Sequence, residues 1–185
     1  MMAEVRSENF GLLRIILHWS IAFLCIALFI SGLVMVELDY YHPWYHRLPW
    51  WHKSCGVLVI VLVFFHLIWR CYQQKTSAEQ TNKNKRHGWL VSLFHRAMEA
   101  VILLIGISGY FIVTAQGQDL KAFDIISIPP VITEIVHLED KAGIAHYYLA
   151  YFLMFLVFLH TAAALKHHFI DKDDTLLTML GQYRK

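Results

Sequence analysis

The feature that most constrains this chain is its last hydrophobic stretch, residues 142–165, which contains no charged residue but does contain His146 and His160. Fourteen positions separate the two histidines, which at about 100° per residue is within about 40° of four helical turns, so both imidazoles are expected on one face. At about 1.5 Å of rise per residue they lie about 21 Å apart along the axis. An apolar helix of this length spans a bilayer, which places one histidine near each membrane surface.

Composition also indicates a membrane protein. Of the 185 residues, 57% are hydrophobic and only 16% are charged, and the mean hydropathy is +0.46. Soluble domains have about a quarter of their residues charged, so a soluble domain is disfavoured. A net charge of +2 is too small to indicate nucleic-acid binding. The three cysteines lack a metal-binding spacing, and we interpret Cys25 and Cys55 as small core residues that form no disulfide.

Three further hydrophobic runs precede this stretch, and we interpret each as a membrane helix. The first is too long for the core of a signal peptide, so it is expected to be retained. The second is short, but Lys53 and Arg70 at its ends can extend their side chains to the membrane surface. The expected fold is an all-α membrane protein in one domain, residues 1–185, built as a four-transmembrane-helix bundle with helices at residues 11–36, 50–72, 88–114 and 142–168.

The connections between these runs differ in character. Residues 37–51 are rich in tyrosine and tryptophan, which favour the headgroup layer. Residues 116–141 contain two adjacent prolines and mixed charges, so they are expected outside the membrane, with a short surface helix. Residues 171–180 are expected to form a short amphipathic helix with an acidic first turn. Arg96 and Glu99, near the start of the third run, are spaced to pair on one helical face.

The distribution of lysine and arginine predicts the orientation. Twelve of the sixteen lie in the N-terminal segment, the second-to-third connection with its flanks, and the C-terminal tail. By the positive-inside rule, both the N-terminus and the C-terminus are expected to be cytoplasmic. The other two connections then face the periplasm of a bacterium, so the expected location is the bacterial inner membrane, which the chain crosses several times.

Depth in the membrane sorts the histidines into two pairs. His18 lies about one turn inside the first predicted helix, near the cytoplasmic surface, as does His160 on the fourth. His52 opens the second helix at the periplasmic surface, and His146 opens the fourth there. Two imidazoles fill both axial positions of a haem iron. The natural ligand pairs are therefore His18 with His160 and His52 with His146, and each pair would bind one haem iron.

A second pattern supports these four histidines. A flat porphyrin requires small residues beside its ligands, and each of the four has one four positions later: Ala22, Gly56, Ala150 and Ala164. His66 and His95 are instead followed by charged residues. Gly106 and Gly109 on the third predicted helix would also let a ring approach closely. Small residues are common wherever membrane helices pack together, so this pattern supports the pairs without deciding them.

His66 is the main competitor of His18. It follows His52 by fourteen positions, so the second and fourth helices could supply two ligands each, as in quinol-oxidising cytochrome b subunits. Spacing and depth leave this alternative open. Intramembrane ionisable residues are usually functional, and His95 is a further candidate for a ligand, hydrogen-bonding or propionate-side role. Basic residues near the two predicted haem levels are candidate partners of the haem propionates: Arg14, Arg96, Arg47 and Lys53.

Three motifs resemble the bacterial cytochrome b561 family. They are Leu17-His18-Trp19, the sequence HKSCG at residues 52–56, and the long sequence HTAAALKHHFIDKDDTL at residues 160–176. The resemblance covers essentially the whole chain, and residues 40–52 resemble an enterobacterial branch of the family. It implies four helices that hold two b haems. It also favours His18 over His66, because Leu-His-Trp is the first-helix ligand motif of the family.

The resemblance further implies a ubiquinone site near His167. Seven positions separate His160 from His167, within about 20° of two turns, so both lie on one face. A histidine can donate a hydrogen bond to a quinone carbonyl and can carry a proton, and Lys166 and Asp171 are candidate proton relays. One member of the family oxidises superoxide. The long periplasmic connection of this chain is more acidic than basic, which disfavours steering of an anion.

The expected function is electron transfer across the membrane through two b haems. Ubiquinone would exchange electrons on the cytoplasmic side and a one-electron partner on the periplasmic side, with superoxide as one candidate, which would make the chain a quinone-linked oxidoreductase. The alternative is a haem-containing anchor subunit that connects a periplasmic redox protein to the quinone pool and has no substrate of its own. A histidine-lined metal transporter would need polar residues along a continuous path, which the hydrophobic runs lack.

Overall fold

The computed structural model describes residues 2–76, 85–133 and 135–182. Within them the chain forms four long helices and a short fifth one: α1 (Met2–Glu37), α2 (Arg47–Thr76), α3 (Lys85–Thr114), α4 (Leu138–Phe169) and α5 (Thr175–Met179). Four segments are long and apolar enough to cross a membrane: Gly11–Glu37, Arg47–Cys71, Val91–Thr114 and Leu138–Phe169. The predicted bundle of four membrane helices is confirmed.

All four long helices begin earlier than predicted, and the starts of α2 and α4 have a local explanation. α2 begins at Arg47 and includes Pro49, which is tolerated because the first turn of a helix does not use that N–H group. α4 begins at Leu138, and its first turn contains Glu139 and Asp140. These carboxylates complement the positive end of the helix dipole, which allows α4 to extend beyond its apolar stretch.

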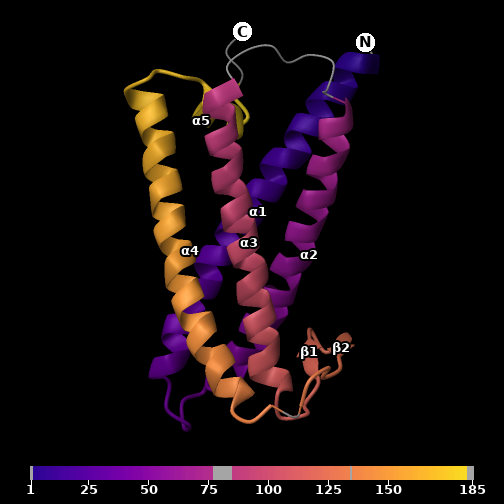
Figure 1. Cartoon of the computed structure of the whole chain (residues 1–185), viewed down its shortest axis with the longest axis vertical. Helices are drawn as coiled ribbons and strands as arrows, with labels where there is room; N and C mark the ends of the chain where they lie inside the picture. Colours follow the sequence, from indigo (N-terminus) through magenta and orange to yellow (C-terminus); the bar gives the residue numbers. More distant parts are fainter. Residues whose placement is uncertain (1, 77–84, 134, 183–185) are drawn as a thin grey trace.

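The four long helices pack side by side in two pairs. α1 packs along α2 and α3 packs along α4, while α2 also contacts α3 (Figure 1). The start of α1 and the short α5 lie at the same end of the bundle (Figure 1), which we call the terminal end. The opposite end carries the connection between α3 and α4, and we call it the hairpin end. The two ends of the bundle are therefore distinguished by the segments that they carry, whichever way the bundle is oriented in a membrane.

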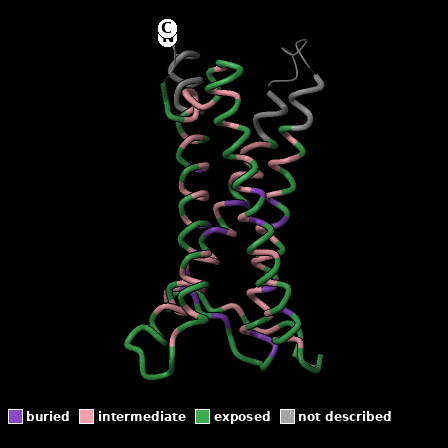
Figure 2. Tube along the Cα trace, turned by 90° about the vertical axis from the view of Figure 1, so that its left-hand side faces the viewer, coloured by how far each residue is buried: buried purple, intermediate pink, exposed green. Residues whose placement is uncertain are grey.

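The buried core of the bundle is thin. It consists of a few residues near the middle of the helices: Cys25, Val59, Val63, Val101, Leu153 and Leu156. Most other apolar side chains on the helices point outward. In Figure 2, exposed residues (green) recur along the whole length of the helices. Such a surface suits lipid, since helices satisfy their own backbone hydrogen bonds there. The three cysteines are free thiols.

The connection between α3 and α4 forms a hairpin of two short strands, β1 (Leu120–Ala122) and β2 (Ile126–Ile128), which pair antiparallel. The surface helix predicted in this connection is wrong. The isoleucine-rich second strand favours a sheet, and the two prolines that follow it cannot continue a helix. Contacts with α2 hold the turn, because the Phe123 N–H group donates to Ser54 Oγ at 2.9 Å and Trp50 Nε1 donates to Asp124 at 3.1 Å.

The predicted helix at residues 171–180 is shorter than expected and lacks the acidic first turn. Only Thr175–Met179 is helical, with Asp174 as its N-cap residue. Asp171 instead accepts hydrogen bonds from the end of α4, and Lys172 has a left-handed backbone conformation, with φ of 55°. A left-handed residue interrupts a right-handed helix, so the tail turns before α5 begins.

Candidate functional site

The hairpin end brings together two histidines from different helices. The ring centres of His52 on α2 and His146 on α4 lie 6.2 Å apart. Two imidazoles that ligate one metal ion have N–metal bonds of about 2 Å, and each ring centre lies about 1 Å behind its nitrogen, so the ring centres are about 6 Å apart. The observed separation therefore fits an iron atom between the two rings.

Hydrogen bonds with α3 determine which nitrogen of His146 is available to a metal. The Nδ1 atom lies 3.0 Å from the Ile105 carbonyl oxygen and 3.2 Å from Ser108 Oγ. A carbonyl can only accept, so Nδ1 carries the proton and Nε2 has the free lone pair. Gly109 lets the ring lie against α3, because a Cβ atom there would be 3.2 Å from His146 Cε1. Gly106, by contrast, makes room for the side chain of Ile60.

His52 has the same arrangement, with support from α1. Its Nδ1 atom lies 2.8 Å from Ser31 Oγ, and the Ser31 hydroxyl donates its own hydrogen to the Leu28 carbonyl at 2.8 Å. The serine oxygen must then accept from Nδ1–H, which leaves Nε2 free as a ligand atom. Metal-binding histidines are commonly oriented in this way. The sequence analysis missed both serines, although a serine in an otherwise apolar helix is a signal that could have identified them.

The terminal end brings together His18 on α1 and His160 on α4. Their ring centres are also 6.2 Å apart. Aromatic side chains enclose the pair, because Phe94 stacks on His160 at 6.4 Å and Trp19 meets His18 edge-on at 5.5 Å. The two pairs therefore present the same ring separation at opposite ends of the bundle, on residues that were predicted to form them.

The competing histidines have different partners. His66 on α2 places Nδ1 3.2 Å from the Glu99 carboxylate of α3. The His95 ring lies 4.9 Å from that of His160, and its Nδ1 is 2.8 Å from the Val91 carbonyl oxygen, one turn back on the same helix. The structure thus pairs His18 with His160 and pairs His66 with a carboxylate.

The predicted pair of Arg96 and Glu99 on one helical face is wrong. Glu99 is buried and turns toward α2, where its carboxylate lies 3.3 Å from an Arg70 guanidinium nitrogen. The other terminal nitrogen of Arg70 donates to Ser92 Oγ at 2.7 Å. Arg70 therefore bridges two residues of α3, which exposed Arg96 does not do. A cross-helix guanidinium with two partners is a stronger competitor than an exposed neighbour on the same helix.

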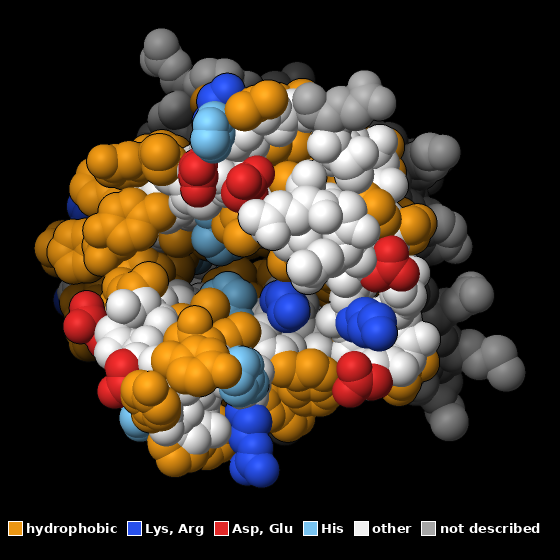
Figure 3. Space-filling model, turned by 90° about the horizontal axis from the view of Figure 1, so that it is seen from below, with side chains coloured by type: hydrophobic (Ala, Val, Ile, Leu, Met, Phe, Trp, Pro, Cys, Tyr) orange, Lys and Arg blue, Asp and Glu red, His pale blue; other side chains and the backbone are white. Residues whose placement is uncertain are grey.

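The basic residues proposed for propionates lie at both ends. Arg14 is exposed and lies one turn before His18 on α1. Arg47 is exposed and lines a cavity of about 490 Å³ together with Trp44, His46, Trp50 and Trp51. Lys53 is half-buried beside His52. Viewed from the hairpin end, the face has a hollow bordered by hydrophobic and histidine side chains, and a basic side chain lies close by (Figure 3).

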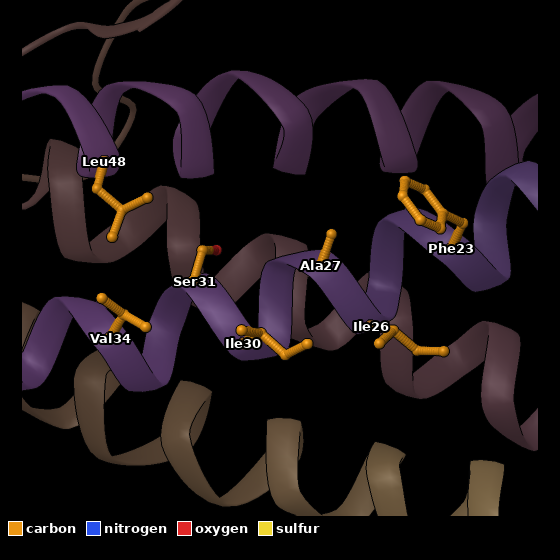
Figure 4. Close-up of a pocket in the computed structure, with 7 residues that line it drawn as sticks. All are labelled: Phe23, Ile26, Ala27, Ile30, Ser31, Val34 and Leu48. Carbon is orange, nitrogen blue, oxygen red and sulfur yellow. The ribbon is translucent and has the colours of Figure 1, made fainter.

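An apolar groove of about 410 Å³ runs along α1 close to the hairpin-end histidines. Ser31, which supports His52, is its one polar lining residue, and the others are Phe23, Ile26, Ala27, Ile30, Val34 and Leu48 (Figure 4). Pockets for organic cofactors are usually of this size and are mostly apolar with a few polar groups. The groove would offer a hydrophobic surface to the edge of a flat ring bound at His52.

The tail after α4 brings the candidate quinone residue to the terminal end. His167 Nδ1 lies 2.6 Å from Asp171, and Lys166 Nζ donates to the same carboxylate oxygen at 2.7 Å. The hydrogen bond from Lys166, with a further one from His167, holds the pKa of Asp171 below its usual range. The Trp19 indole N–H donates to the Met179 carbonyl at 2.8 Å, which fastens the tail beside His18.

Comparisons with known proteins agree with the resemblance seen in the motifs. The family model "Prokaryotic cytochrome b561" matches residues 9–182. "Cytochrome b561 homolog 2" of Escherichia coli (strain K12) is 36% identical over 180 residues, which covers 95% of this chain and 93% of that protein. "Probable superoxide oxidase CybB" of Yersinia pestis is 27% identical over 180 residues, which covers 96% of this chain and 98% of that protein. The predicted family and its enterobacterial branch are both confirmed.

Proposed function

This chain belongs to the prokaryotic cytochrome b561 family, and we propose that it conducts electrons across the membrane through two b haems, each held by one histidine pair. Family membership makes it a multi-pass bacterial membrane protein that transfers electrons and uses haem b. The observation that carries the two-haem proposal is the equal separation of the ring centres, 6.2 Å for His52 with His146 and for His18 with His160.

The residues of each pair define what the cofactor does there. A bound b haem supplies an iron atom that accepts and returns one electron. In each pair the two histidines would hold the haem iron, and such a site would transfer electrons without binding a substrate at the metal. At the hairpin end, Ser31 and the Ile105 carbonyl hold the Nδ1–H groups of His52 and His146. These bonds fix the ring orientation and make Nε2 a better donor to iron.

We assign the terminal end to the cytoplasm and place ubiquinone exchange near His167. The excess of lysine and arginine at this end supports the orientation. His167 lies where α4 leaves its apolar stretch, so an isoprenoid tail can stay in lipid while the headgroup meets polar groups. The Asp171 carboxylate accepts from Nδ1–H of His167, so Nε2 can donate to a quinone carbonyl when the ring carries its second proton. Asp171 and Lys166 can pass protons, which quinone reduction consumes together with electrons.

The electron partner at the hairpin end is the less constrained part of the proposal. Superoxide is one candidate, because a relative is named a probable superoxide oxidase. The second candidate function is that of a haem-containing anchor subunit for a periplasmic redox protein. The observation that favours it is an acidic and aromatic outer face, with half-buried Glu139 and exposed side chains on both connections: Tyr40, Tyr41, Asp124 and Asp140. An acidic face repels superoxide and attracts a basic partner.

The test of the proposed function is haem quantitation with a reduced-minus-oxidised spectrum of the purified chain. Two b haems per chain are expected, both reducible by a quinol analogue in the absence of any other protein. One haem per chain would overturn the assignment of the two pairs. Two haems that a quinol analogue cannot reduce would overturn the quinone site, and co-purification of a periplasmic redox protein in that case would favour the anchor subunit.

A further inference from the structure

Four polar residues form a cluster inside the membrane-spanning part of α2 and α3. The side chain of Glu99 is 11% exposed, and its carboxylate contacts His66 Nδ1 at 3.2 Å and Arg70 at 3.3 Å. Arg70 in turn donates to Ser92 Oγ. None of these residues belongs to either proposed haem-ligand pair. Ionisable groups are costly in a membrane and usually have a function there, so the cluster requires an explanation beyond helix packing.

The charges in the cluster leave one site at which a proton can be gained. The guanidinium of Arg70 stays protonated and balances the charge of the Glu99 carboxylate. The carboxylate can only accept, so His66 donates Nδ1–H to it and Nε2 retains a lone pair. Histidine is the side chain that changes its charge between about pH 5 and pH 8. Of the three residue types, histidine is the one whose charge changes in that range.

The cluster lies within electrostatic range of the histidine pair at the terminal end. His95 lies one turn before Glu99 on α3, and its ring centre is 4.9 Å from that of His160. The His160 ring centre is in turn 6.2 Å from that of His18. Charges interact more strongly in the low dielectric of a membrane protein than in water. A change of charge at His66 is therefore sensed at His18, and the effect is reciprocal.

We propose that His66, oriented by Glu99, takes up one proton at Nε2 when the haem at His18 and His160 gains one electron, and releases it when that electron leaves. The proposal rests on the proposed assignment of these two ligands. The iron is reduced from Fe(III) to Fe(II), the electron comes from a quinol or a redox mediator, and the proton comes from water at the terminal end. The added proton offsets the added electron, so the total charge near His18 is unchanged.

The experiment is an optical redox titration of both haems from pH 5.5 to pH 8.5, a range chosen around the usual histidine pKa of about 6.5. The component that disappears in His18→Ala is the one at the terminal end. Its midpoint potential should fall as pH rises, by up to about 59 mV for each tenfold fall in proton concentration. The potential falls because a protonated His66 stabilises the reduced haem, and that proton is lost as pH rises. His66→Gln should abolish this slope.

Three further variants separate the cluster from its surroundings. Ser92→Ala removes a bond of Arg70 but no titrating group, so the slope should stay. Glu99→Gln removes the charge that stabilises protonated His66, so the sloping range should move to lower pH. His95→Gln should leave the slope in place, and a slope that disappears only in this variant would overturn the proposal by assigning the proton to His95.

Haem content distinguishes the failure of this proposal from failure of the proposed function. His66→Gln should retain two haems per chain. With both haems present, an unchanged slope in His66→Gln, or a potential that is independent of pH in the unmodified protein, would overturn the proton uptake alone. Loss of a haem in His66→Gln would make His66 a ligand and overturn both proposals. If His66→Gln does not fold, an unchanged pH range in Glu99→Gln would reject the proposal.

Discussion

At the scale of single residues, the second ring nitrogen distinguishes the histidines from one another. In His146, Nδ1 donates to a main-chain carbonyl, and in His52 it donates to a serine whose own hydrogen is already used. Both rings therefore present an unprotonated Nε2. His66 donates to a carboxylate instead, which gives a different chemistry to a histidine of the same spacing. The nature of the Nδ1 partner is thus a better guide to role than sequence spacing.

The first prediction concerns the ligands themselves. His52→Ala and His146→Ala should each remove the haem at the hairpin end, and His18→Ala and His160→Ala should each remove the other one, because a haem that loses an axial ligand binds weakly. His66→Ala should retain both. Haem content per chain and the two spectral components measure this. Loss of a haem in His66→Ala but not in His18→Ala would show that α2 and α4 each supply two ligands.

The second prediction concerns the two serines. Ser31→Ala removes the hydroxyl that holds His52, so affinity for the hairpin-end haem should fall about 10-fold to 100-fold, the usual cost of losing such a partner. Ser108→Ala is the matched control, because His146 keeps the Ile105 carbonyl and should lose much less. Titration of haem into apoprotein measures both. Equal losses in the two variants would show that the hydroxyls act by packing and not by orienting the rings.

At the scale of elements, the apolar runs were predictable and the tertiary partners were not. A lipid environment demands helices, so the four runs were sufficient to place α1 to α4. The hairpin depends on Ser54 and Trp50 of α2, far away in sequence, and could not be inferred from local composition. The same holds for Glu99, whose partner is on α2. Spacing along one helix could not decide between His18 and His66, because it does not reveal which helix faces His160.

The third prediction concerns the tail that follows α4. His167→Leu should keep both haems and slow their reduction by a quinol analogue at least tenfold, because the headgroup loses its hydrogen-bonding partner. Lys172→Met is the matched control for the loss of a polar group at this end, because this exposed residue has no proposed role in the quinone site. Stopped-flow haem reduction measures the rate. An unchanged rate in His167→Leu would place the quinone elsewhere, with the start of α3 around His95 as the next region to test.

Asp171 adds a pH dependence to the same element. Its pKa is lowered by Lys166 and His167, so the contribution of this carboxylate to holding the tail is present above its usual pKa of about 3.9 and is lost only as pH falls through the lower folded value. The contact of Asp171 with Lys166 and His167 should therefore persist between pH 7 and pH 5, and its loss should not lower the quinol-driven rate in that range. Asp171→Asn should mimic the acid form at neutral pH, and a wild-type rate in that variant would exclude Asp171 from the site.

At the scale of the whole molecule, the bundle has two chemically different ends. The described part of the terminal end carries the tail that follows α4, and the hairpin end carries the aromatic and acidic connections (Figure 1). The fourth prediction is that a reporter active only in the periplasm is silent when fused after Lys185 and active when inserted near Pro129. The reverse activity pattern would exchange the sides assigned to the two haems while leaving their ligands unchanged.

The fifth prediction concerns the charge of the hairpin end and follows from that asymmetry. On the long connection, Asp119, Asp124, Glu139 and Asp140 outnumber Lys121 and Lys141. An acidic face repels a small anion. Added salt screens this repulsion, and at 0.1 M it is largely screened beyond about 10 Å. Haem reduction by superoxide should therefore accelerate as ionic strength rises, whereas reduction by a redox protein with a basic face should slow down.

Charge-neutralising variants make this test specific to the connection. Glu139→Gln combined with Asp140→Asn should raise the rate with superoxide at low salt and reduce its dependence on ionic strength, because less repulsion remains to be screened. Lys121→Gln is the opposite control and should lower that rate. Stopped-flow absorbance of the haems at several salt concentrations measures all three. A superoxide rate that falls with salt in the unmodified protein would show that the cationic side chains nearer His52, Arg47 and Lys53, dominate the field and guide the anion despite the acidic connection.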